Sequence, residues 1–185
     1  AYLNLGSYIN DTKGTANGYF ELSGTISETT GSWLSLGFSV NNTPAVLETG
    51  GSPQNFTSNG TDGIATMIYR SGGEIAAFAG PQTADGSGNT AAQSGARTFT
   101  IALDLTTHNG VDDFGSVEFR DSALGVIDSH SYGVDQNFGS ILLSTAGGST
   151  GTYSNLALTQ VPEPSAALLI GLSVLGLAMV RRRRS

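Results

Sequence analysis

Short segments in which apolar and polar residues alternate recur along most of this chain, and they restrict its fold more than any other feature. In the segment 34–40, for example, Leu34, Leu36 and Phe38 share one parity, while serine and glycine take the other. Successive side chains of an extended strand point to opposite faces, so such a segment predicts a strand with one buried face and one wet face. The predicted strands are 20–26, 34–40, 64–70, 75–79, 98–106, 116–120, 126–132, 140–145 and 153–159.

Glycine-rich breaks separate the predicted strands. Glycine makes up 26 of the 185 residues, about twice its usual frequency. Turn signals at 17–18, 71–73, 109–110 and 147–148 contain glycine or asparagine, which can adopt positive φ. Since no stretch before Gln160 keeps a sustained helical apolar period, we predict an all-β fold, an antiparallel β-sandwich or jelly roll. The chain has no cysteine, so disulfides and thiolate metal sites are excluded.

The chain is acidic, and its charge is distributed unevenly. Its 15 acidic and 8 basic residues give a net charge of −7. Half of the basic residues form a run at 181–184, and only one acidic residue, Glu163, lies beyond residue 160. Residues 1–160 therefore carry 4 basic against 14 acidic residues, a balance of −10. A surface this acidic repels phosphate backbones, so we expect no nucleic-acid partner.

The C-terminal part of the chain differs from the rest. Residues 165–180 carry no charge, and their apolar residues would surround a helix on all sides. Such a helix would reach roughly 24 Å, and flanking arginines help it to bridge a hydrocarbon core of ~30 Å. We predict a transmembrane helix with its basic tail in the cytoplasm. The stop-transfer residues are Arg181, Arg182, Arg183 and Arg184.

The prolines before this helix mark the end of the folded domain. Neither Pro162 nor Pro164 offers an N–H to a strand ladder, so the last strand should end near Gln160. The predicted division is therefore an exported β-sandwich domain at 1–160, a Pro-Glu-Pro linker at 161–164, a transmembrane helix at 165–180 and a basic cytoplasmic tail at 181–185.

The order of these C-terminal features resembles the PEP-CTERM sorting signal of Gram-negative bacteria. The likeness rests on Val161, Pro162, Glu163 and Pro164, followed by the apolar segment and the arginine cluster. Such a signal implies export by an N-terminal signal peptide, which we expect to be absent from this chain, and temporary retention in the inner membrane. It also implies that an exosortase removes the helix and tail. The mature protein would then reach the cell surface or an extracellular polysaccharide matrix.

Three segments of the body resemble concanavalin/laminin-G-like jelly rolls. They are 19–24 (YFELSG), 33–38 (WLSLGF) and 151–158 (GTYSNLAL). The resemblance implies that the first and last strands pair and that the two chain ends meet. This arrangement suits a domain that is tethered by its C-terminus.

Residues that could carry catalysis are scattered along the chain. His108 and His130 lie outside any recognisable catalytic pattern, and no G-x-S-x-G motif is present. A sandwich glycosidase needs two carboxylates that face one cleft. Glu118 and Asp121 are the nearest local pair, but a spacing of three points them to opposite faces of a strand. Although carboxylates distant in the sequence could still converge, we predict no catalytic residues and no enzyme.

Two kinds of binding site have candidate residues. Asn109, Asp112 and Asp113 offer clustered oxygen ligands for calcium, although adjacent aspartates in a turn are more often simply solvated. Trp33 and Tyr19 have the parity of outward-facing residues and could present flat faces to a glycan. The alternative is that Trp33 packs beneath a loop, because large aromatic side chains are usually buried.

These features predict an exported cell-surface or matrix protein whose β-sandwich is noncatalytic and structural, adhesive or glycan-contacting. Its expected partners are an exosortase during sorting, the inner membrane before processing and an extracellular polysaccharide. One alternative is an exported polysaccharide-active enzyme, a glycosidase or lyase, on the same fold. A second is a surface protein that self-assembles through sheet edges or loops.

Overall fold

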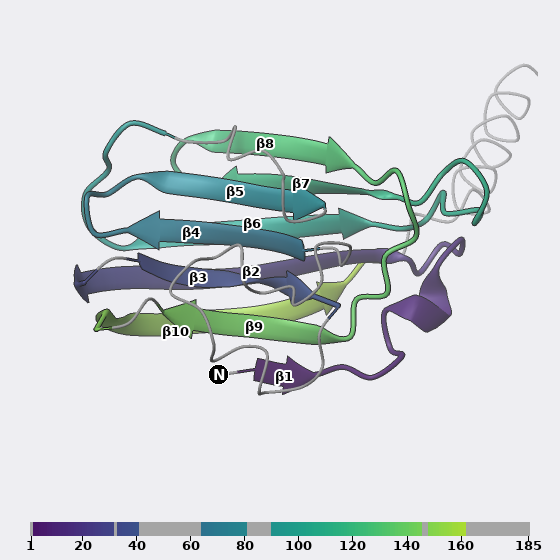
Figure 1. Cartoon of the computed structure of the whole chain (residues 1–185), viewed down its shortest axis with the longest axis horizontal. Coiled ribbons are helices and arrows are strands. Elements are labelled where there is room, and N and C mark those ends of the chain that lie inside the picture. Colours follow the sequence, from purple (N-terminus) through teal and green to yellow (C-terminus); the bar gives the residue numbers. More distant parts are fainter. Residues whose placement is uncertain (1, 32, 41–63, 81–89, 146–147, 162–185) are drawn as a thin grey trace, which may run out of the picture.

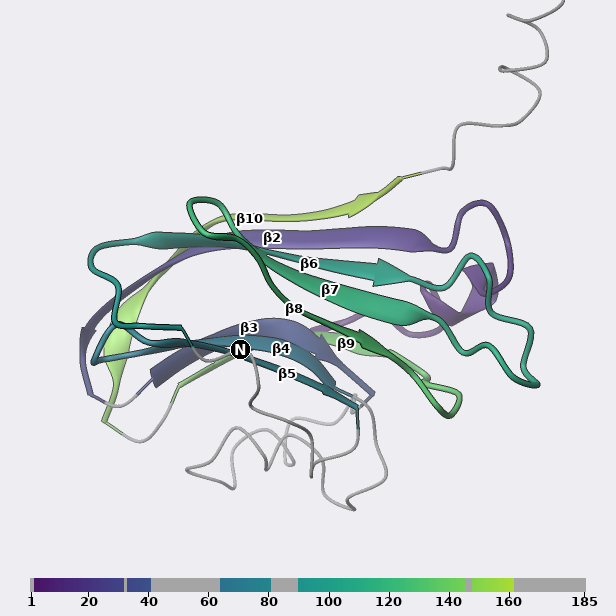
Figure 2. The same ribbon diagram turned by 90° about the horizontal axis from the view of Figure 1, so that it is seen from above.

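Two antiparallel β-sheets form the body of the protein (Figures 1 and 2). The structure, a computed structural model, describes residues 2–31, 33–40, 64–80, 90–145 and 148–161. In chain order the elements are β1 (Tyr2–Asn4), the 3₁₀ turn η1 (Asn10–Thr12), β2 (Tyr19–Thr30), β3 (Trp33–Ser39), β4 (Ile64–Arg70), β5 (Ile75–Gly80), β6 (Arg97–Asp104), β7 (Ser116–Asp121), β8 (Gly125–Ser131), β9 (Ser140–Thr145) and β10 (Thr150–Gln160).

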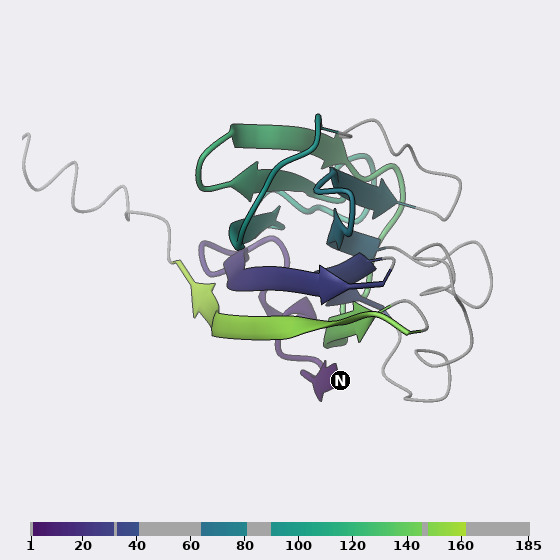
Figure 3. The same cartoon turned by 90° about the vertical axis from the view of Figure 1, so that its left-hand side faces the viewer.

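The strands are arranged as the two layers of a jelly-roll sandwich, which confirms the predicted fold class. Sheet I has the order β1-β9-β3-β4-β5, and sheet II has the order β10-β2-β6-β7-β8. Every neighbouring pair is antiparallel. The edge strands β1 and β10 lie on the same side of the sandwich, at the bottom of Figure 3, and β5 and β8 lie on the other side.

The hydrophobic core fills the space between the sheets. The alternation in the sequence supplies it, because alternate residues of each strand point inward. Sheet II contributes Phe20 and Leu22 from β2, and sheet I contributes Leu34 and Leu36 from β3, all of them at most 2% exposed. The phenylalanines of the core pack edge to face with other rings, as Phe38 does with Phe138. Such contacts add to the stability that apolar burial provides.

Strand β3 departs from the predicted pattern, because both of its faces are buried. Trp33 lies on the outer face of sheet I, yet only 5% of it is exposed. It belongs to a second apolar cluster on that face, which also contains Ile68, Ala76, Phe78 and Leu142. The alternation of β3 places Ser35 and Ser39 outward with Trp33, but the apolar residues of its neighbours make this outer face a second core.

The two ends of the described chain lie close together, although the pairing differs in part from expectation. β2 is the first strand that the sequence predicts, and it pairs with β10 as expected. β1 has only three residues and no alternation long enough to detect; it pairs with β9 in the other sheet. Tyr8 Oη donates to Gln160 Oε1 at 3.2 Å, and the Val161 N–H donates to the Tyr19 carbonyl at 2.9 Å.

Gly37 allows β3 and β4 to lie against each other on the outer face of sheet I. A Cβ atom at this position would lie 2.7 Å from the Thr66 Cα and would also overlap the Ala65 carbonyl oxygen. We expect Gly37→Ala to lower the free energy of unfolding by about 2 kcal/mol, because backbone atoms must move to admit the methyl group. Urea denaturation of residues 1–161 measures the change. Gly72→Ala is the matched control, since a Cβ atom there would meet nothing within 4 Å; an equal loss in both variants would contradict this explanation.

Candidate functional site

Charged side chains gather on the outer face of sheet II, where three strands run side by side. The register places Glu21 of β2, Ala102 of β6 and Glu118 of β7 in one row across the sheet. Arg120 lies in the next row beside Thr100. The inward neighbours of these residues belong to the core, so this face is held on a rigid sheet rather than on a loop.

Arg120 joins the two glutamates. Its Nε donates to Glu118 Oε1, and its Nη1 donates to Glu21 Oε1 at 3.2 Å. Tyr19 Oη donates to the same Glu21 oxygen at 3.2 Å. The guanidinium therefore connects the two glutamates of one row, and Ala102, which lies between them in the register, is only 3% exposed although it faces outward. We refer to Tyr19, Glu21, Glu118 and Arg120 as the Arg120 cluster.

The electrostatics of the Arg120 cluster favour hydrogen bonding to a polar partner. A tyrosine phenol is protonated at neutral pH, and partial burial raises the pKa of Tyr19 further, so its hydroxyl can donate. Arginine is always charged in proteins, and the hydrogen bond to Glu118 raises the pKa of Arg120 further. The side chains of Glu21, Glu118 and Arg120 remain 33%, 35% and 40% exposed, respectively, and can thus be reached from solvent. Two carboxylates against one guanidinium leave the cluster with a net negative charge.

The sequence indicates only part of this cluster. The outward parity predicted for Tyr19 and Glu21 agrees with their place on the outer face of sheet II. The sequence suggests Glu118 as a member of a carboxylate pair only with Asp121. Those two residues do lie on opposite faces of β7, as their spacing predicts. The pair Glu21 and Glu118 was missed because the residues are far apart in the sequence, and alternation within a strand does not reveal which strands become neighbours.

Trp33 and Tyr19, the two candidate glycan contacts, lie on the outer faces of different sheets. They cannot form one aromatic platform. Trp33 points outward, as its parity predicts, but it is buried in the second apolar cluster rather than exposed. Tyr19 is therefore the one of the two whose surroundings offer a glycan an accessible polar surface.

The candidate calcium ligands lie in the connection between β6 and β7 and largely bond to one another. Asn109 Oδ1 accepts the backbone N–H groups of Val111 (2.9 Å), Asp112 (3.1 Å) and Asp113 (3.2 Å). Asn109 Nδ2 donates to Asp112 Oδ1 at 2.6 Å, and Asp113 Oδ1 accepts the Gly115 N–H at 2.9 Å. Within the described parts of the chain, no three His, Cys, Asp or Glu residues are grouped so that they could hold a metal. These bonds suffice to explain the turn, and calcium binding stays a prediction.

The two histidines, His108 and His130, contact neighbouring side chains of the fold. His108 Nε2 lies 3.0 Å from Asp135 Oδ1, which also accepts from Lys13 Nζ at 2.6 Å. Partial burial of Asp135 opposes its ionisation, but the hydrogen bonds from Lys13 and His108 outweigh this and lower its pKa. His130 packs edge-on against Tyr132. The contacts of Asp135 with Lys13 and His108 join three loops that are distant in the sequence.

Asp121 forms a buried ion pair with Arg97. The Asp121 side chain is fully buried, that of Arg97 is 12% exposed, and Asp121 Oδ1 also accepts the Ala123 and Leu124 N–H groups at 3.0 Å. We expect Arg97→Met to lower the free energy of unfolding by about 3 kcal/mol, because it leaves a buried carboxylate without its cation. Thermal and urea denaturation measure the loss.

Arg70→Met provides the control for this variant. Arg70 pairs with Glu74 at the surface, where the two side chains are 40% and 49% exposed, so its loss should cost less than about 1 kcal/mol. Equal losses for the two arginines would show that burial does not decide the effect.

The last strand leads directly into the segment 160–184, which matches the family model described as the PEP-CTERM protein-sorting motif. The chain carries a PEP-CTERM sorting motif. The motif implies an exported protein with a membrane-anchored precursor and an exosortase as its processing partner. Among the residues that the structure describes, no helix is both long and apolar enough to cross a membrane; the predicted helix 165–180 and its basic tail lie outside those residues.

Comparison of the whole chain with known proteins identifies solved structures that have a similar fold. No curated protein matches the sequence. Among solved structures, alginate lyase Aly36B is 14% identical with a TM-score of 0.52 and covers 78% of this chain and 70% of its own. A double mutant of Aly36B in complex with an alginate tetrasaccharide is 13% identical with a TM-score of 0.51 and the same coverage. The PL-14 alginate lyase from Aplysia kurodai is 11% identical with a TM-score of 0.44, covering 80% and 71%.

The two Aly36B structures contradict the prediction that the chain is not an enzyme. That prediction relied on the lack of a catalytic motif in any one segment of the chain, whereas solved enzymes share this sandwich architecture. At this level of identity the likeness is one of fold. The sandwich is thus a scaffold that some polysaccharide lyases use, and the absence of a motif in the sequence does not exclude an activity.

Proposed function

We propose that this is an exported, exosortase-processed protein whose sandwich contacts a polysaccharide through the Arg120 cluster. The observation that carries the proposal is the sorting motif, which begins where β10 ends. A protein that is sorted in this way and released from its anchor would act at the cell surface or in an extracellular matrix, where polysaccharide is the abundant partner.

The outer face of sheet II offers the chemistry that a sugar requires. Tyr19 supplies an aromatic ring and a hydroxyl donor, Arg120 supplies further donors, and the two glutamates accept. Ser23 and Thr100 extend this polar surface in the row of Arg120. Because residues 1–160 carry a balance of −10, a neutral glycan should bind better than a polyanionic one.

A second candidate function is cleavage of the bound polysaccharide. It is favoured by the row that holds Glu21 and Glu118 on either side of Ala102, since glycoside hydrolysis uses two carboxylates that face one substrate. The fold neighbours include an alginate lyase in complex with its tetrasaccharide, so a sandwich of this kind can present a sugar chain to reactive groups. Arg120 would have to leave the glutamates for a sugar to lie between them.

The sorting part of the proposal predicts two masses. In a host with a functional exosortase, the protein should lose the helix and tail, while a strain without the enzyme should retain them. Glu163→Ala should block the loss in the first strain, whereas Glu74→Ala, at an exposed glutamate outside the motif, should leave it intact. Intact-mass spectrometry of the exported protein measures the difference in mass. Identical C-termini in the two strains would contradict processing.

The proposed contact with polysaccharide predicts that substitutions on the outer face of sheet II weaken binding and that a substitution on sheet I does not. We expect Tyr19→Ala and Arg120→Ala each to weaken retention on a neutral glycan in affinity electrophoresis by about tenfold, roughly 1.4 kcal/mol. Arg70→Ala is the matched control, because its side chain is also 40% exposed but lies on sheet I. A panel of neutral, anionic and amino-sugar polymers identifies the class of ligand. If Arg70→Ala weakens binding as much as Arg120→Ala, the face is wrongly assigned.

The same panel separates binding from cleavage. Release of oligosaccharides that disappears in both Glu21→Gln and Glu118→Gln would establish the second candidate function. Binding without release at any pH would support contact alone.

A further inference from the structure

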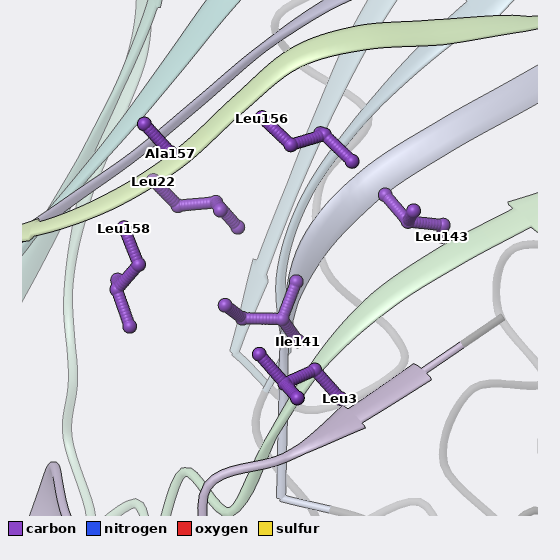
Figure 4. A pocket seen from close by; sticks show the side chains of 7 residues that line it. All are labelled: Leu3, Leu22, Ile141, Leu143, Leu156, Ala157 and Leu158. Carbon is purple, nitrogen blue, oxygen red and sulfur yellow. The ribbon is translucent and has the colours of Figure 1, made fainter.

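An apolar groove opens on the side of the sandwich where the edge strands β1 and β10 lie. It has a volume of about 230 Å³ and lies between the two sheets. Leu3, Ile141 and Leu143 of sheet I face Leu22, Leu156 and Leu158 of sheet II across it, as Figure 4 shows. Leu3 is 57% exposed and Leu156 is 45% exposed, so the core reaches solvent here.

Three of the four strands that line this groove carry no charge. β1, β9 and β10 contain no Asp, Glu, Lys or Arg, although residues 1–160 hold 14 acidic residues. The other strands of sheet II are charged: Glu21 on β2, Asp104 on β6 and Glu118 on β7 are examples. Edge strands usually carry lysine or another charge that prevents pairing with further strands. β10 is eleven residues long and lacks that protection.

This distribution of charge identifies the kind of partner. Two copies of a domain with a balance of −10 repel each other wherever their acidic surfaces meet. The strands β1, β9 and β10 carry no such charge, and, unlike the buried strands β3 and β5, which also lack charge, their side of the sandwich combines an exposed strand edge with exposed leucines. We propose that a second copy of this chain docks here, with its β10 antiparallel to the first, so that the two copies of sheet II form one continuous sheet and the two grooves close on each other.

The bulge in β10 determines which part of the strand pairs. The register shifts between Ser154 and Ala157, and Asn155 adopts a φ of 51°. Leu156 thereby points inward and uses the space left by Gly24, where a Cβ atom would lie 2.6 Å from its Cδ2. Beyond the bulge the ladder with β2 is regular from Ala157 to Gln160. This regular segment is the edge that the second copy extends.

The charges of the Arg120 cluster permit this arrangement. In the joined sheet, Glu21 of one copy and its counterpart would be three strand spacings apart, roughly 14 Å. That exceeds the Debye length of about 8 Å at physiological ionic strength, so their repulsion is largely screened. The dimer would present two Arg120 clusters on one continuous face. The docking itself does not depend on their binding a polysaccharide.

Sedimentation equilibrium of residues 1–161 tests the proposal without the apolar C-terminal segment, whose own association would obscure it. This part of the chain contains every strand and every buried core residue that the structure describes. We expect the wild type to dimerise in the micromolar range. Leu3→Glu should weaken dimerisation at least tenfold, because it places a carboxylate in the closed groove. Val126→Glu is the matched control: Val126 is also 57% exposed, but it lies on β8 at the other side of the sandwich.

A second variant and a second measurement keep the test independent of folding defects. Thr159→Lys places a charge on the regular edge, next to Glu21 in the register, and should also give monomers. Hydrogen exchange of the backbone amides of 157–160 should slow with increasing protein concentration in the wild type and in Val126→Glu only. A monomeric wild type at several hundred micromolar would overturn the proposal, as would equal effects of Leu3→Glu and Val126→Glu. Dimerisation without concentration-dependent exchange at 157–160 would overturn the pairing through β10.

Discussion

The apolar contact between the inner faces of the two sheets is the interaction on which the rest of this structure depends. Phe20 and Leu22 of β2 meet Leu34 and Leu36 of β3 in a core that contains no disulfide and, among the described residues, one deeply buried ion pair. Burial of these side chains fixes the register of each strand, since a shift by one residue would turn its apolar set outward. The same register decides which residues lie on the outer faces of the two sheets.

The outer faces of the two sheets differ in their exposure to solvent. The outer face of sheet I holds Trp33 and a second apolar cluster, and its alternate serines are buried with them. The outer face of sheet II holds the Arg120 cluster and remains accessible. A polar ligand that meets the described surface therefore finds hydrogen-bonding groups on sheet II. The side of the sandwich with β1 and β10 differs from both outer faces. These two strands carry no charged residue, and the core is open to solvent between the sheets there.

Alternation predicted the fold well, and the candidate site only in part. Each of the nine predicted strands corresponds to a strand from β2 to β10, because strands in a two-layer sandwich need a period of two to bury one face. β1 was missed, since three residues are too short to show a period. The sequence left both an exposed and a buried Trp33 open, because parity gives the direction of a side chain but not what lies above it, and the structure shows Trp33 buried. The prediction that the chain is not an enzyme is contradicted by the fold neighbours. It relied on local spacing, and strand order brings together residues such as Glu21 and Glu118 that are far apart in the sequence.

The sequence by itself determined the β class, the acidic balance and the sorting motif, because each of these depends on the order of residues along one stretch of chain. Strand order was decided by the tertiary structure, because it depends on which apolar faces pack together after the chain has turned back on itself. That order placed Arg120 between two distant glutamates and left the uncharged β10 at an edge. Neither feature can be read from any one segment, since each arises only when strands far apart in the chain become neighbours.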